Sequence, residues 1–178
     1  DRAEYFEQLA SWKTDSVAAS WHGSGAWREG LLTADYVVER IGELSDHAAT
    51  YVADVGQNQM WLARYTGFRQ PNSHVSSGGL GTMGFSVPAA MGAALGRPDR
   101  ETWAITGDGG FQMTFQELMT LVADHIPVKI ALLDNKKLGM IRQWQEIIYA
   151  GNYHSANLPG PDFAKLADAF GVAIQPLA

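Results

Sequence analysis

The chain has 178 residues, of which 46% are hydrophobic and 18% charged, with a formal net charge of −6. This composition is typical of a globular domain with a substantial core, and the negative charge argues against nucleic acids and anionic membranes as partners. The absence of cysteine excludes disulfides, thiolate nucleophiles and thiolate-bound zinc. No signal peptide or membrane-spanning run is visible, so a cytoplasmic location is expected.

The first 30 residues are rich in tryptophan, glycine, serine and charged side chains. We expect residues 1–30 to form an irregular linker whose Trp12, Trp21 and Trp27 pack against a neighbouring domain. A single domain is then expected over residues 31–178.

The first half of this domain alternates helix and strand. Apolar residues at helical spacing predict a helix over 34–45, and 50–54 predicts the first strand. A short helix is expected to open at Gly56, followed by a loop over 66–76 with solvated Arg69 and His74. Small residues over 85–96 then predict a helix that packs closely on its neighbours.

The second half holds the clearest strand, helix, strand pattern. Residues 101–106 predict a strand that ends at a glycine-rich turn, and the nearly all-apolar 128–133 predicts a second, buried strand. Between them, Thr114 and Glu117 stand at capping-box spacing, which predicts a helix from 114 to about 125.

Two further helices are expected after the second strand. Residues 138–148 predict one, and 162–170 predict another that Asp162 caps; a loop over 149–161 joins them. The fold class that follows is α/β, as a three-layer α/β/α domain with a mainly parallel sheet.

Chemistry is expected where the two strands of the second half end. A right-handed connection brings their carboxyl ends to one edge of the sheet, which is where open α/β sheets bind ligands. Asp108 and Asn135 therefore lie side by side there. A carboxylate, an amide oxygen and a loop carbonyl suit Mg²⁺ that also holds phosphate oxygens. Gly107 and Gly109 let the backbone approach those phosphates.

Four separated motifs carry a family resemblance. Gly107-Asp108-Gly109, followed after 24 residues by Asp134-Asn135, resembles the thiamine-diphosphate signature. The stretches 56–61, 77–85 and 138–145 resemble the large catalytic subunit of acetolactate synthase (acetohydroxyacid synthase). The resemblance covers roughly residues 30 to 175 and implies the thiamine-diphosphate-binding fold.

The resemblance also assigns residues to roles. Mg²⁺ is held by Asp108, Asn135 and the backbone carbonyl of Lys137. Met83 bends the cofactor into its V shape, and the Gly81 carbonyl accepts from the aminopyrimidine. Met140 and Trp144 line the substrate channel. The full set of implied cofactor-binding residues is Gly56, Gln57, Asn58, Gly81, Met83, Gly107, Asp108, Gly109, Gly110, Asn135, Lys137, Leu138, Gly139, Met140 and Ile141.

Three positions depart from the family pattern. Asn58 stands where a histidine is usual, which removes charge and reach toward phosphate. Gly110 replaces a serine that many relatives have, and Asp134 replaces the first of two asparagines. If Asp134 turned inward, the metal would face two carboxylates.

The implied function is that of a branched-chain amino acid biosynthetic carboligase. Pyruvate is decarboxylated on thiamine diphosphate, and the two-carbon unit joins a second 2-keto acid. The catalytic Glu is expected on an N-terminal domain of a partner subunit, so these residues alone are expected to be inactive. The resemblance implies a homodimer or homotetramer, and leaves open FAD on a middle domain and a regulatory small subunit. A further strand and helices would be expected after residue 178.

Three alternatives stay open. A sister thiamine enzyme, such as pyruvate oxidase or glyoxylate carboligase, could share the frame, although Trp144 argues against it. A non-catalytic cofactor-binding module could explain the three departures. An unrelated nucleotide-binding domain is poorly supported, because Gly79-x-Gly81-x-x-Gly84 follows a loop rather than a strand.

Overall fold

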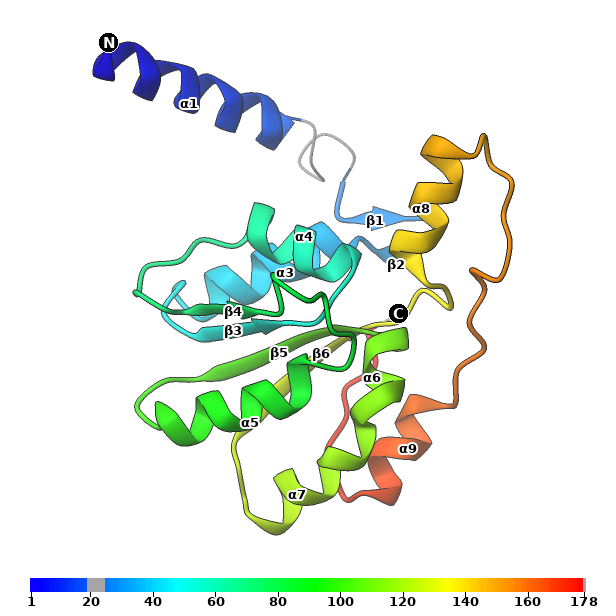
Figure 1. Ribbon diagram of the computed structural model, residues 1–178. Coiled ribbons are helices and arrows are strands. Elements are labelled where there is room, and N and C mark those ends of the chain that lie inside the picture. The colour runs from blue at the N-terminus through cyan, green and yellow to red at the C-terminus, as the bar shows by residue number, and fades with distance from the viewer. Residues whose placement is uncertain (19–24, 178) are drawn as a thin grey trace.

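The computed structural model describes residues 1–18 and 25–177 and shows a four-stranded sheet between two layers of helices (Figure 1). The strands pair in parallel in the order β4-β3-β5-β6. This confirms the predicted α/β class with a mainly parallel sheet. The strands are β3 (Thr50–Ala53), β4 (His74–Ser76), β5 (Thr102–Gly107) and β6 (Val128–Leu133).

Helices α3 (Ala34–Leu44) and α4 (Gln57–Tyr65) cover one face of the sheet, with Val38 and Leu62 fully buried against Tyr51. The other face is covered by the remaining core helices, through two apolar clusters. These helices are α5 (Ser86–Gly96), α6 (Asp108–Thr114), α7 (Leu118–Ala123) and α9 (Phe163–Ala169), with the short 3₁₀ turn η1 (Phe115–Glu117) between α6 and α7.

Strand alternation divides the core between these two layers. Tyr51 and Ile105 pack toward α3 and α4, whereas Val52 and Ala104 pack toward α5. Val52 on β3 pairs with Ala104 on β5, so a branched and a small side chain lie next to each other on neighbouring strands. The closely packed alanines of α5, such as Ala90, bury against this face as predicted.

The remaining described elements lie outside the layers. Helix α8 (Gly139–Ile148) has no buried residue, and β1 (Trp27–Arg28) and β2 (Leu31–Leu32) form a separate antiparallel hairpin (Figure 1). Helix α1 (Arg2–Ala18) projects from the body of the domain. Among the described residues, no helix combines the length and the apolarity that crossing a bilayer requires.

The expectation of irregular structure over 1–30 was wrong for its first half, because α1 is a helix of 17 residues. Its composition of alanine, glutamate and other helix formers supports that state, and the scattered aromatic residues obscured it. Trp12 and Trp27 are more than half exposed. Trp21 lies outside the described residues, so the predicted packing of three indoles stays a prediction.

The expected loop over 66–76 also contains a strand, β4, which adds the edge of the sheet. His74 on this strand is half-buried rather than solvated, and its ring stacks on Phe68 with centroids 5.0 Å apart. Burial lowers the pKa of His74. Three residues are too few for alternation to reveal a strand.

The helix expected to start at Thr114 starts instead at Asp108, directly after β5. The capping box is not formed, because Thr114 ends α6 and donates its hydroxyl to the Gly84 carbonyl at 3.0 Å. The prediction at α9 is confirmed: the Asp162 side chain accepts from the backbone N–H groups of Ala164 and Lys165.

Candidate functional site

A cavity of about 300 Å³ lies at the carboxyl ends of β3, β5 and β6. Every residue predicted to bind the cofactor lines it, from Gly56 on the first strand's loop to Ile141 on α8. The sequence therefore identified which residues meet here, and their individual roles stay predictions.

Four glycines of the cavity wall stand where a Cβ atom would crowd a neighbouring side chain: Gly107, Gly109, Gly110 and Gly139. A Cβ atom at Gly139 would lie 2.2 Å from Oε1 of Gln57, and one at Gly107 would lie 3.1 Å from Nδ2 of Asn58. A Cβ at Gly109 would lie 3.3 Å from Cε of Met83. The backbone is thus bare toward the cavity, which suits a ligand that needs N–H donors at close range.

Asp108 forms the first residue of α6 and is only 2% exposed. Its Oδ2 atom is buried without a hydrogen-bond partner. Burial, and then the negative charge of Asp134, raise the pKa of the Asp108 carboxyl. A buried carboxylate oxygen without a donor is costly, and a cation is the partner that would relieve this cost.

Asp134 lies beside Asp108 because Gly107 pairs with Leu133 and each aspartate is the next residue. Its carboxylate accepts from the backbone N–H of Lys136 at 3.3 Å and forms an ion pair with the ammonium group of that residue. The site thus holds two neighbouring carboxylates, one buried and one paired at the surface.

Asn135 and Lys137 complete the expected metal side of the cavity. The Oδ1 atom of Asn135 accepts from the backbone N–H of Lys137 at 3.0 Å. An amide oxygen has a second lone pair, so this bond leaves it able to ligate a cation. Within residues 1–18 and 25–177, no cluster of three or more histidines and carboxylates offers an alternative metal site.

Gln57 and Asn58 open α4 and line the same cavity. Nε2 of Gln57 donates to Oε1 of Gln143 on α8 at 3.0 Å, which ties the two helices together across the cavity. Asn58 is 5% exposed, and its Oδ1 atom has no partner. Gly56 precedes them with a φ of +123°, a conformation that L side chains rarely adopt.

These features fit a metal-bridged diphosphate. A cation would satisfy the buried Oδ2 of Asp108, and the bare glycine backbone offers close approach to anionic oxygens. Met83 is half-buried and lines the same cavity.

The two residues predicted to line a substrate channel separate in the structure. Met140 lines the cavity, whereas Trp144, one turn further along α8, does not and is 56% exposed. The role of Trp144 therefore stays a prediction.

Three lining residues were not assigned to the site from the sequence: Val55, Trp61 and Leu133. Trp61 was expected in the core, and it does pack against the cluster around Tyr51 while it also faces the cavity. Its position four residues after Gln57 on α4 puts both on one helix face, which was the available signal.

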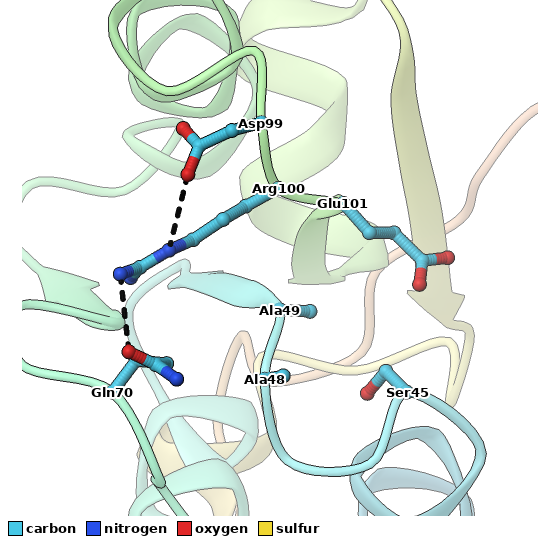
Figure 2. Close-up of a pocket in the computed structure, with 7 residues that line it drawn as sticks. All are labelled: Ser45, Ala48, Ala49, Gln70, Asp99, Arg100 and Glu101. Carbon is cyan, nitrogen blue, oxygen red and sulfur yellow. Dashed lines mark hydrogen bonds and ion pairs between the residues drawn. The ribbon is translucent and has the colours of Figure 1, made fainter.

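A second cavity, of about 390 Å³, lies at the amino-terminal edge of the sheet (Figure 2). Arg100 crosses it and donates to Gln70 at 3.2 Å, and its Nε atom lies 3.9 Å from Asp99. Glu101 pairs with Lys129. The polar groups of this cavity are thus matched with one another, and no sequence motif falls on them.

Comparison with known families agrees with the cavity at the carboxyl edge. Residues 54–176 match the family described as thiamine pyrophosphate enzyme, C-terminal TPP binding domain. The chain belongs to this family. The match spans the end of β3 to the segment after α9, so it includes every wall of the site. Thiamine diphosphate is therefore the cofactor for which this domain is built.

Individual relatives within this family to which the chain is similar include acetolactate synthases. The chain is 49% identical to an acetolactate synthase of Mycobacterium avium over 92% of its own length and 28% of the relative's. It is 42% identical to the acetolactate synthase isozyme 2 large subunit of Escherichia coli, over 79% of the chain and 26% of that protein. It is also 36% identical to the mitochondrial acetolactate synthase catalytic subunit of Aspergillus candidus, over 100% of the chain and 26% of that protein. This thiamine pyrophosphate enzyme domain thus spans about a quarter of the length of the curated relatives it matches.

Proposed function

We propose that this domain is the diphosphate-binding part of an acetolactate synthase large subunit, an enzyme of branched-chain amino acid biosynthesis. The whole protein would decarboxylate pyruvate and transfer the two-carbon unit to a second 2-keto acid. The observation that carries the proposal is the buried, unpartnered Oδ2 of Asp108 on the wall of a glycine-lined cavity.

The chain's own residues would hold the cofactor by its diphosphate end. Asp108, Asn135 and the carbonyl of Lys137 would ligate Mg²⁺, and the backbone of Gly107, Gly109 and Gly110 would face the phosphate oxygens. Gln57 and Asn58 would donate to the terminal phosphate. Thiamine diphosphate, when bound, supplies the nucleophilic carbon for decarboxylation and transfer of the two-carbon unit.

Met83 and Gly81 would orient the other end of the cofactor. Both line the cavity, and Gly81 has a φ of +64° that fixes the turn before Met83. Met140 would exclude water from the reacting face. Trp144, exposed on α8, would contact the acceptor keto acid once α8 is covered.

At the level of the whole protein, we infer a homodimer or homotetramer, because the Glu that activates the pyrimidine would come from a partner subunit. A middle domain with FAD, a regulatory small subunit and a cytoplasmic location are part of the same proposal. We expect residues 1–178 alone to bind the cofactor but not to form acetolactate.

A titration of the chain with thiamine diphosphate tests the binding step. Trp61 lines the cavity, so its fluorescence should report saturation in the presence of Mg²⁺ and no saturation with EDTA. Asp108→Ala should weaken binding by about 100-fold or more, as loss of a metal ligand does. Asp124→Ala, an exposed carboxylate after α7, is the matched control and should bind like the wild type. Binding that survives both EDTA and Asp108→Ala would sink the proposal.

The reaction itself is tested on the full-length protein that contains this domain. Pyruvate alone should yield acetolactate, and pyruvate with 2-ketobutyrate should yield acetohydroxybutyrate. Oxidation of pyruvate without a carboligated product would instead favour a sister thiamine enzyme. Cofactor binding without turnover would favour a non-catalytic module.

A further inference from the structure

The loop that carries Met83 is held by a carboxylate that no sequence motif includes. Asp54 follows β3 and is fully buried. Its Oδ1 atom accepts from the backbone N–H groups of Val55 at 2.9 Å and Gly84 at 3.0 Å. Its Oδ2 atom accepts from the backbone N–H and the hydroxyl of Ser86, at 3.0 and 2.8 Å. Four donors fix this carboxylate in one orientation.

Asp54 also supplies the cap that α5 lacks locally. The residue before the helix, Phe85, makes no side-chain cap bond. The first helical N–H, that of Ser86, donates instead to Asp54, which is 32 positions away in the sequence. An anionic group is favoured at the amino end of a helix by the aligned backbone dipoles. The start of α5 is therefore fixed to the end of β3.

Gly84 is held from the other side by Thr114. The Thr114 hydroxyl donates to the Gly84 carbonyl at 3.0 Å. Gly84 has a φ of +84°, and a Cβ there would lie 3.0 Å from Cγ2 of Thr114. The N–H of Gly84 is thus bound to the end of β3 and its carbonyl to α6. Met83 is the adjacent residue, so this clamp sets where its side chain begins.

The same carboxylate occupies the space that a side chain at residue 110 would need. A Cβ atom at Gly110 would lie 2.2 Å from Oδ1 and 2.6 Å from Cγ of Asp54. The four hydrogen bonds prevent the carboxylate from moving aside. The glycine at 110, which departs from the serine of many relatives, therefore has a local steric cause.

We propose that Asp54 and Thr114 are positioning residues that fix the Met83 loop against the cavity before any ligand binds, and that Asp54 makes glycine obligatory at residue 110. The proposal rests on the proposed function only in taking Met83 to touch the cofactor. It adds a reason for the shape of the cavity: the loop is clamped between the end of β3 and the end of α6.

The steric part is tested by a double-mutant cycle in urea unfolding. In the native background, Gly110→Ala should lower the folding equilibrium constant by about 30-fold or more, as overpacking in a core does. In the Asp54→Ser background the same change should cost less than about threefold. The control is Gly92→Ala on α5, where a Cβ meets nothing within 4 Å. An equal cost of Gly110→Ala in both backgrounds would overturn the steric claim.

The clamp is tested separately at Thr114, in case the Asp54 variants do not fold. The ¹³C-methyl NMR signal of Met83, assigned with Met83→Leu, reports the loop. Thr114→Val removes the hydroxyl and should shift or broaden this signal, whereas Thr114→Ser keeps the hydroxyl and should leave it in place. An unchanged Met83 signal in Thr114→Val would show that the clamp does not position the loop.

Two ligands then separate this proposal from the proposed function. With Mg²⁺ present, Thr114→Val should weaken thiamine diphosphate about fivefold and leave inorganic pyrophosphate unchanged, because pyrophosphate does not reach Met83. Equal weakening of both probes would contradict a specific role for the loop. If the wild-type chain binds neither probe, the proposed binding function fails, while the NMR and unfolding results still decide the clamp.

Discussion

Two cavities of similar size lie at opposite edges of one sheet. They differ in whether the polar side chains that line them have hydrogen-bond or ion-pair partners. At the carboxyl edge, Asp108 and Asn58 each keep a buried oxygen without a partner. At the amino edge, Arg100, Asp99 and Gln70 are bound to one another (Figure 2). Their volumes, about 390 Å³ at the amino edge and about 300 Å³ at the carboxyl edge, do not explain this difference. Among the described residues that line these two cavities, buried polar atoms without a partner occur only at the carboxyl edge.

The two cavities also differ in how much of their lining is glycine backbone. Among the described residues, six glycines line the carboxyl-edge cavity and none lines the amino-edge one. A Cβ atom at Gly110 would lie 2.2 Å from Oδ1 of the hydrogen-bonded Asp54, and one at Gly139 would lie 2.2 Å from Oε1 of Gln57 and would have to displace that side chain. Parallel strands end at the carboxyl edge, and helices begin there, so backbone donors converge on that side only.

The largest expected effect, and the strongest test that the carboxyl edge is the binding site, comes from Asp108→Asn. Without metal, this change should raise the free energy of unfolding by about 1 kcal/mol, because it removes a buried charge whose Oδ2 has no partner. It should also abolish Mg²⁺-dependent binding of pyrophosphate. Urea unfolding and a pyrophosphate titration measure the two effects. A loss of stability together with intact binding would mean that Asp108 is structural.

Gly139→Ala tests whether the bare backbone matters. The new Cβ would displace Gln57, whose side chain is flexible, and break its bond to Gln143. We expect about tenfold weaker binding of thiamine diphosphate and a change in stability below about 1 kcal/mol. Gly92→Ala on α5 is the matched glycine control and should leave binding unchanged. If the Gly139→Ala chain bound thiamine diphosphate normally, Gln57 would not contribute to binding.

The residues at the carboxyl edge could be predicted from the sequence because they directly follow strands that the sequence also predicts. Asp108 directly follows one apolar strand and Asn135 closely follows the next, and parallel pairing brings the ends of such strands together. Leu133 and Trp61 were missed as lining residues because an apolar side chain gives the same signal in a core and in a wall. Trp61 was missed even though it is only one helical turn from Gln57, a residue that was predicted to bind the cofactor.

Long-range contacts were beyond the reach of local patterns. Thr114 and Glu117 have the spacing of a capping box, yet the hydroxyl of Thr114 is used by Gly84, 30 positions away. Asp54 was predicted only as the end of a strand, although its carboxylate caps α5. Short elements such as β4 failed for another reason, because three residues carry too little periodicity.

Asp134→Asn probes the charge beside the metal site. Its negative charge helps to raise the pKa of Asp108, so its removal should bring that pKa closer to the ordinary value. Less negative charge also attracts a cation less strongly, and Mg²⁺ alone should bind about threefold more weakly. Calorimetry with Mg²⁺ measures this, with Asp124→Asn as the control for net charge. Tighter Mg²⁺ binding in Asp134→Asn would contradict this expectation and show that Asp134 opposes the metal.

Arg100→Gln is the smallest expected effect and tests the other edge. The guanidinium is mostly buried, but its partner Asp99 is well exposed, so the pair contributes little. Loss of the bond to Gln70 should cost about 0.5–1 kcal/mol in urea unfolding. Binding of thiamine diphosphate and Mg²⁺ should not change, because the two cavities share no residue. If Arg100→Gln weakened binding, the two edges would be coupled through β3 and β5, and matched polar groups would no longer mark an edge as inert.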